Sequence, residues 1–109
     1  MKSYVLFGID KYHHARALAL VNADGIAAAA EKLGGKVREA RTVGENDPYR
    51  LTADKGQECA IFTPGPCTDE VLAAATGPAD AATKLVAYYR YGTDNVYRQY
   101  QLATLPVAG

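Results

Sequence analysis

The predicted fold is built around Asn22-Ala-Asp-Gly-Ile-Ala-Ala-Ala-Ala-Glu-Lys-Leu-Gly-Gly-Lys-Val37. Asn22 or Asp24 can accept hydrogen bonds from the unpaired N–H groups that begin a helix, and alanine has the highest helix propensity of all residues. Gly34 and Gly35 supply the left-handed residue at which helices commonly end. We therefore expect a helix with both ends marked, followed at once by a strand.

Four segments around this helix have the composition of β-strands. The first and third are apolar on both faces, which is typical of strands in the middle of a sheet. The second and fourth carry more charged and polar side chains, which suits the edges of a sheet. In chain order the segments are residues 3–10, 36–43, 58–63 and 95–105.

Two further segments are assigned to helix or loop. Residues 11–21 are expected to form helix or loop leading into the main helix, with an extended segment as the less favoured alternative, since periodicity cannot assign a short apolar run. Thr68 is a good N-cap, and the acidic residues that follow it suit the first turn of a helix. We therefore expect a second helix, in two pieces, that extends from there to Tyr89.

The predicted element order is β-α-β-β-α-β, which is the ferredoxin-like unit. We expect a single α+β domain over residues 1–109, with a four-stranded antiparallel sheet and two helices on one face of it. Right-handed connections place the first and third strands in the middle and the second and fourth at the edges. The helices cover only one face, so the apolar opposite face needs another cover, and a second copy of the chain is the simplest. The sequence therefore predicts a homodimer.

The charge balance bears on the choice of partner. Twelve basic and twelve acidic side chains cancel, and no run of like charge occurs. Nucleic acids and anionic membranes bind clustered Lys and Arg, so we expect neither as a partner. No apolar run approaches the roughly 20 residues that cross a bilayer, and no secretory leader is recognised. A cytoplasmic protein is expected.

Three stretches of the chain carry a family resemblance. The helix-to-strand passage of GYD-domain proteins is similar to the run Ala27-Ala-Ala-Ala-Glu-Lys-Leu-Gly-Gly-Lys-Val37. Their Gly-x-Tyr-Asp signature resembles Gly44-Glu-Asn-Asp47, in which Asn46 replaces the tyrosine, and the approach to their last strand resembles residues 95–98. The resemblance implies a dimeric α+β barrel, the superfamily to which GYD-domain proteins belong.

Tyrosine side chains and an arginine are the candidate ligand-binding groups. A tyrosine ring can stack on a planar ligand while its hydroxyl orients a polar group, and an arginine can hold a carboxylate. Together they would suit a planar, oxygenated aromatic molecule. The alternative is an interface, where Tyr and Arg are enriched. The candidates are Tyr88, Tyr89, Tyr91, Tyr97 and Arg98.

His13 and His14 are the candidate catalytic residues. Histidine titrates near neutral pH, so one of them could act as a general base, although a solvated pair is the competing interpretation. The first and last strands are expected to be antiparallel neighbours, which would bring the histidines near Tyr97 and Arg98. No zinc signature or phosphate-binding glycine loop is present, and we expect no metal and no cofactor.

The resemblance leaves the activity open, because fold does not determine function. The wider superfamily includes cofactor-independent monooxygenases, polyketide cyclases, isomerases and amino-acid-sensing regulatory domains. Three functions are compatible with the sequence: a small cofactor-independent enzyme acting on an aromatic or polyketide-like molecule, a non-enzymatic ligand-sensing or PII-like regulatory module, and a structural assembly protein. We expect a small-molecule ligand and leave open whether the protein is an enzyme.

Overall fold

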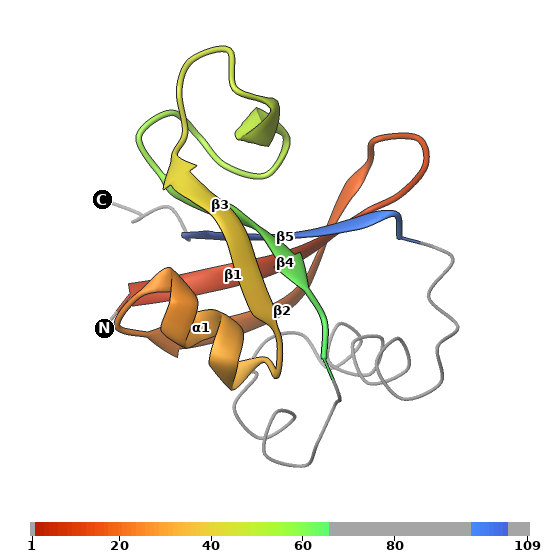
Figure 1. Cartoon of the computed structure of the whole chain (residues 1–109). Coiled ribbons are helices and arrows are strands. Elements are labelled where there is room, and N and C mark those ends of the chain that lie inside the picture. The colour runs from red at the N-terminus through yellow and green to blue at the C-terminus, as the bar shows by residue number, and fades with distance from the viewer. Residues whose placement is uncertain (1, 66–96, 105–109) are drawn as a thin grey trace.

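The computed structural model describes residues 2–65 and 97–104. Its centre is a five-stranded antiparallel sheet with the strand order β2-β1-β5-β4-β3 (Figure 1). One short α-helix and one 3₁₀ turn complete the described part of the chain. The elements are β1 (Lys2–Ile9), β2 (Ala15–Ala23), α1 (Ile26–Lys32), β3 (Lys36–Thr42), η1 (Pro48–Leu51), β4 (Glu58–Thr63) and β5 (Gln99–Thr104).

The predicted ferredoxin-like fold is wrong, and with it the dimeric α+β barrel built from such units. The sheet has five strands rather than four, and β5, which we expected at an edge, lies between β1 and β4. The described residues contain a single α-helix. The second predicted helix, from Thr68 to Tyr89, lies outside the described residues. The predicted antiparallel pairing of the first and last strands is confirmed, with Ile9 opposite Gln99.

The additional strand, β2, forms a hairpin with β1. The Asp10 carboxylate accepts the backbone N–H groups of Tyr12 (2.8 Å) and His14 (3.0 Å), and His13 adopts a left-handed φ of 62°. These hydrogen bonds shape a turn that lacks glycine, which is why the sequence did not suggest a hairpin. Alanine favours helices in isolation, but burial of Leu18 and Val21 in the core outweighs that preference.

Helix α1 is shorter than the sequence predicted. Its N-cap is Gly25, which supplies no side-chain hydrogen bond. Neither predicted cap, Asn22 or Asp24, takes this place: Asn22 lies in β2, and its Oδ1 accepts a hydrogen bond from the Ser3 hydroxyl (2.7 Å). The predicted end is confirmed, since Gly34 takes a left-handed φ of 74° directly after the helix.

The two faces of the sheet have separate cores. Successive residues of a strand point to opposite faces, so Ala60 and Phe62 of β4 belong to one core while Cys59 and Ile61 belong to the other. Helix α1 packs on the first face. The first core includes Tyr4, Leu6, Leu18, Val21, Phe62, Tyr100 and Leu102, and the second includes Val43, Tyr49, Ala53, Cys59 and Ala103.

Residues 43–57 cover part of the second face, which we had expected a second copy of the chain to cover. The Asp47 carboxylate accepts hydrogen bonds from Arg41 Nε (2.9 Å) and Nη2 (2.7 Å), and from the Tyr49 N–H (3.0 Å). The Arg41 guanidinium lies 4.5 Å from the centroid of the Tyr49 ring. These contacts place Tyr49 and Ala53 in the second core.

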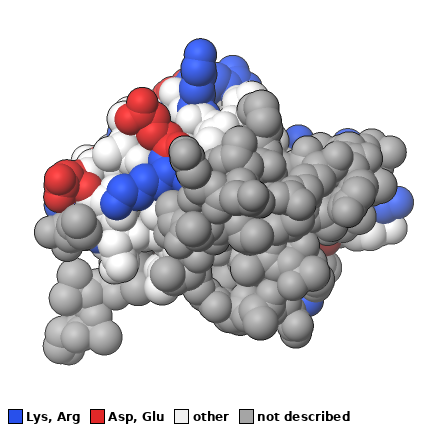
Figure 2. All heavy atoms as spheres, turned by 90° about the horizontal axis from the view of Figure 1, so that it is seen from below, with Lys and Arg blue, Asp and Glu red and all other residues white. Residues whose placement is uncertain are grey.

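The described surface carries charges of both signs. Figure 2 shows Lys and Arg side chains close to Asp and Glu side chains on the described part of the face seen there. This mixture agrees with the net charge of zero. Among the helices of residues 2–65 and 97–104, none has the length and apolar character needed to cross a membrane.

Candidate functional site

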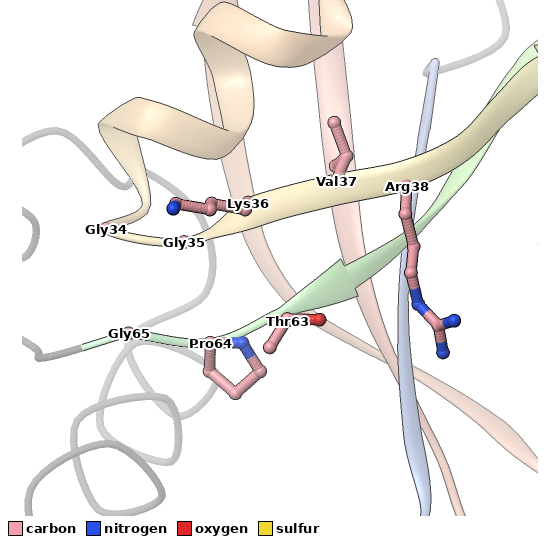
Figure 3. Close-up of a pocket in the computed structure, with 8 residues that line it drawn as sticks. All are labelled: Gly34, Gly35, Lys36, Val37, Arg38, Thr63, Pro64 and Gly65. Atoms are coloured by element: carbon pink, nitrogen blue, oxygen red, sulfur yellow. The ribbon is translucent and has the colours of Figure 1, made fainter.

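Two clefts meet where β3 and β4 approach residues 97–100. The first, which we call the glycine cleft, has a volume of about 510 Å³ (Figure 3). The second, the tyrosine cleft, has a volume of about 280 Å³. Arg38, Thr63 and Pro64 border both. The glycine cleft is also lined by Gly34, Gly35, Lys36, Val37 and Gly65, and the tyrosine cleft by Ile61, Phe62, Tyr97, Arg98, Gln99 and Tyr100.

Close backbone packing forms the wall of the glycine cleft. A Cβ atom at Gly65 would collide with the carbonyl oxygen of Gly34, and one at Gly35 would collide with the Phe62 ring and the Thr63 carbonyl oxygen. Only glycine therefore allows the two chain segments to lie this close. The cleft depends on the same Gly-Gly pair that ends helix α1.

Arg38 is placed at the junction of the clefts by the alternation of β3. Val37 packs against the first core, so its neighbour Arg38 points to the opposite face of the strand, as Figure 3 shows. Arg38 is exposed, and its guanidinium has no hydrogen-bond or ion-pair partner among the described residues. Arg41, on the same strand, is instead paired with Asp47 at 2.7 Å.

Tyr97 and Arg98, both predicted as ligand-binding residues, line the tyrosine cleft together. Tyr97 is 9% exposed, and its ring centroid lies 6.0 Å from that of Tyr100, at an interplanar angle of 61°. The Arg98 N–H donates a hydrogen bond to the Ile9 carbonyl (2.8 Å), which ties the start of the last strand to the end of the first. The Arg98 side chain is exposed and has no partner within residues 2–65 and 97–104.

The predicted catalytic histidines lie in the β1–β2 turn. His13 and His14 are both exposed, and neither is among the described residues that line the two clefts. His14 Nδ1 is 3.8 Å from Asp10 Oδ2. The pKa of the Asp10 carboxyl is lowered, chiefly by the hydrogen bond that it accepts from the backbone N–H of His14. The turn therefore has a structural role of its own.

The remaining predicted ligand-binding residues, Tyr88, Tyr89 and Tyr91, lie outside the described residues. Arg38, Lys36 and Gln99 line the clefts, but sequence reasoning did not select them. The charges of residues 36–43 predict an edge strand, and β3 does lie at an edge of the sheet. The sequence feature that could have identified Arg38 is the alternation along the strand. A residue next to inward-facing Val37 must face the other side of the sheet.

The described residues hold no group of three or more His, Cys, Asp or Glu side chains that could bind a metal ion. The resemblance to GYD-domain proteins stays a prediction. No protein-family model matches the chain, and neither the curated proteins nor the solved structures include a significant match to it.

Proposed function

We propose that the chain binds a small, planar organic anion, such as an aromatic carboxylate, in the two clefts that meet at Arg38. The observation that carries this proposal is the guanidinium of Arg38, which borders both clefts and has no partner among residues 2–65 and 97–104. A guanidinium presents its donors in a rigid fork that matches the two oxygens of a carboxylate.

The aromatic part of the ligand is inferred from the walls of the tyrosine cleft. Tyr97 and Tyr100, which are largely buried, are among its lining residues, and Ile61 and Pro64 add apolar surface. Ligand sites in proteins combine a largely apolar lining with a few polar groups that fix orientation. A flat, apolar ring with one anionic substituent fits this combination.

The charge of the ligand is inferred from the cations around the clefts. Lys36 lines the glycine cleft and Arg98 lines the tyrosine cleft, in addition to Arg38 at their junction. All the charged side chains among the described lining residues are therefore positive. A concave surface lined by charges of one sign raises the local concentration of ligands of the opposite sign.

Isothermal titration calorimetry with 2-naphthoate tests the proposal. We expect the wild-type protein to bind and Arg38→Ala to weaken binding by about 1.5–3 kcal/mol, the range for loss of a charged hydrogen bond. Arg38→Lys should recover only part of this loss, since lysine keeps the charge but not the fork.

Arg16→Ala is the matched control. Arg16 is also exposed on a strand, but it lies in β2, at the opposite edge of the sheet from β3. Its replacement should leave the affinity for 2-naphthoate unchanged. Equal affinities of the wild-type protein and Arg38→Ala, or no binding by either, would contradict the proposal.

A further inference from the structure

A chain of side-chain hydrogen bonds connects the segment over the second core to the tyrosine cleft. The Thr52 hydroxyl donates to Gln101 Oε1 (2.5 Å), and Gln101 Nε2 donates to Gln99 Oε1 (2.8 Å). Gln101 is only 4% exposed, whereas Gln99 is half-buried and lines the cleft. We call these three residues the amide relay.

The relay has a direction, because a primary amide accepts at its oxygen and donates at its nitrogen. Gln101 Oε1 faces the Thr52 hydroxyl and also lies 3.8 Å from the Cys59 thiol, a second donor. Burial raises the pKa of that thiol, which keeps its proton in place. Gln101 must therefore turn its NH₂ group toward Gln99, whose oxygen accepts a hydrogen bond from it.

We propose that the amide relay holds Gln99 with its NH₂ group free to donate a hydrogen bond to a ligand oxygen in the tyrosine cleft. This inference rests on the proposed function and narrows its ligand class. Arg38, Arg98 and Gln99 then all offer donors, so the favoured ligand carries acceptor oxygens. A ligand with an ammonium group at the same place would be repelled by the Arg38 and Arg98 guanidinium groups.

Thr52 and Gln101 act through Gln99 and are positioning residues. Burial fixes the orientation of the Gln101 amide. If Gln101 lost a hydrogen-bond partner, an unsatisfied polar group would remain in the core, which costs free energy. Through Thr52, the relay also connects the segment of residues 43–57 to the proposed ligand-binding site.

The test compares Thr52→Val, which removes the hydroxyl at nearly constant shape, with Thr52→Ser, which retains it. Titration with 2-naphthoate should give a loss of about three- to tenfold in affinity for Thr52→Val, as for one neutral hydrogen bond. Thr52→Ser should bind like the wild-type protein. Thermal melts establish that each variant is folded at the temperature of the titration.

A double-mutant cycle separates positioning from general destabilisation. Gln99→Met removes the proposed donor at similar length, so Thr52→Val in the Gln99→Met background should cause no further loss of affinity. Additive losses would mean that Thr52 supports the structure without orienting Gln99, and they would overturn the inference. Wild-type affinity in folded Thr52→Val would overturn it as well.

The side-chain ¹⁵N–¹H₂ resonances of the 109-residue chain give a readout independent of affinity. In the free protein the NH₂ protons of Gln101 should exchange slowly with solvent and those of Gln99 rapidly. Addition of 2-naphthoate should shift the Gln99 resonances. Binding without that shift would overturn the relay while the proposed function stands. If the wild-type protein does not bind 2-naphthoate, the proposed function and the ligand-facing role of Gln99 fail together.

Discussion

The ring of Tyr97 lies directly on the backbone of Gly8. A Cβ atom at residue 8 would come within 2.7 Å of the ring atoms Cγ and Cδ1, which is closer than a real Cβ can approach. Because Gly8 has no side chain, the Tyr97 ring can pack against the backbone of β1, beside Tyr100. Gly8 thus determines where the Tyr97 ring lies beside the tyrosine cleft.

Gly8→Ala is expected to displace the Tyr97 ring. Forcing a methyl group into this contact should lower the free energy of unfolding by about 1–3 kcal/mol and weaken the binding of 2-naphthoate. Urea denaturation and calorimetry measure the two effects. Gly44→Ala is the control, because a Cβ there meets nothing within 4 Å. Equal stability of the two variants would show that the ring can move away at no cost.

Asp47 is expected to make the fold sensitive to acid. The hydrogen bonds from Arg41, and then from the Tyr49 N–H, hold the pKa of its carboxyl well below the usual range. The unfolded state therefore binds the proton more readily, and the stability supplied by Asp47 is lost as pH falls from about 4 toward the lower pKa of the folded state. Melting temperatures between pH 2 and pH 7 measure this loss.

Asp47→Asn should melt at a lower temperature than the wild-type protein at neutral pH and show a weaker dependence on pH below 4. Asp54→Asn serves as the control, since its exposed carboxylate makes no hydrogen bond within the described part of the chain. Parallel pH profiles for Asp47→Asn and the wild-type protein would contradict the role given to Asp47.

Tyr49 is expected to anchor the segment of residues 43–57. Its side chain is 4% exposed, and its carbonyl oxygen accepts the N–H groups of Thr52 (3.0 Å) and Ala53 (2.9 Å). Hydrogen exchange should therefore protect these two amides in the free protein. Tyr49→Ala should abolish their protection and cost about 3–5 kcal/mol, as for other large buried aromatic residues. Fast exchange in the wild-type protein would contradict the anchoring.

The homodimer inferred from the sequence stays a prediction. Light scattering at micromolar concentration should give twice the chain mass of 11.6 kDa, because apolar side chains such as Phe7 and Ile61 are only partly buried on the second face. A single species with the mass of one chain would contradict it. The segment of residues 43–57 already covers part of that face, which reduces the area left for a partner.

The alternation of apolar residues identified most strands but not their order. Residues 36–43 and 58–63 became β3 and β4 almost unchanged, since the period-two pattern is local information. The position of β5 between β1 and β4 depends on long-range pairing, and β2 depends on the Asp10 turn. The sequence favours helix or loop for the alanine-rich segment that forms β2. Burial in the tertiary structure, rather than intrinsic propensity, makes this segment a strand.

The candidate site was foreseen in part. Tyr97 and Arg98 line the tyrosine cleft, and the rule that placed them near the end of β1 was the antiparallel pairing of the first and last strands. The same rule predicts the histidines there, but they lie in the β1–β2 turn and do not line either cleft. The strand pattern does not single out Arg38, because its place opposite Ile61 depends on the register of β3 with β4.

The most direct test of the central claim is an NMR titration of the ¹⁵N-labelled protein with 2-naphthoate. Binding at the junction of the clefts predicts that amide resonances of residues 34–38, 61–63, 65 and 97–100 shift together with one dissociation constant, whereas those of β2 remain in place. In Arg38→Ala the same shifts should need about ten- to hundredfold more ligand. Shifts confined to β2 and the turn of residues 10–14, or no saturable shifts at all, would contradict the account.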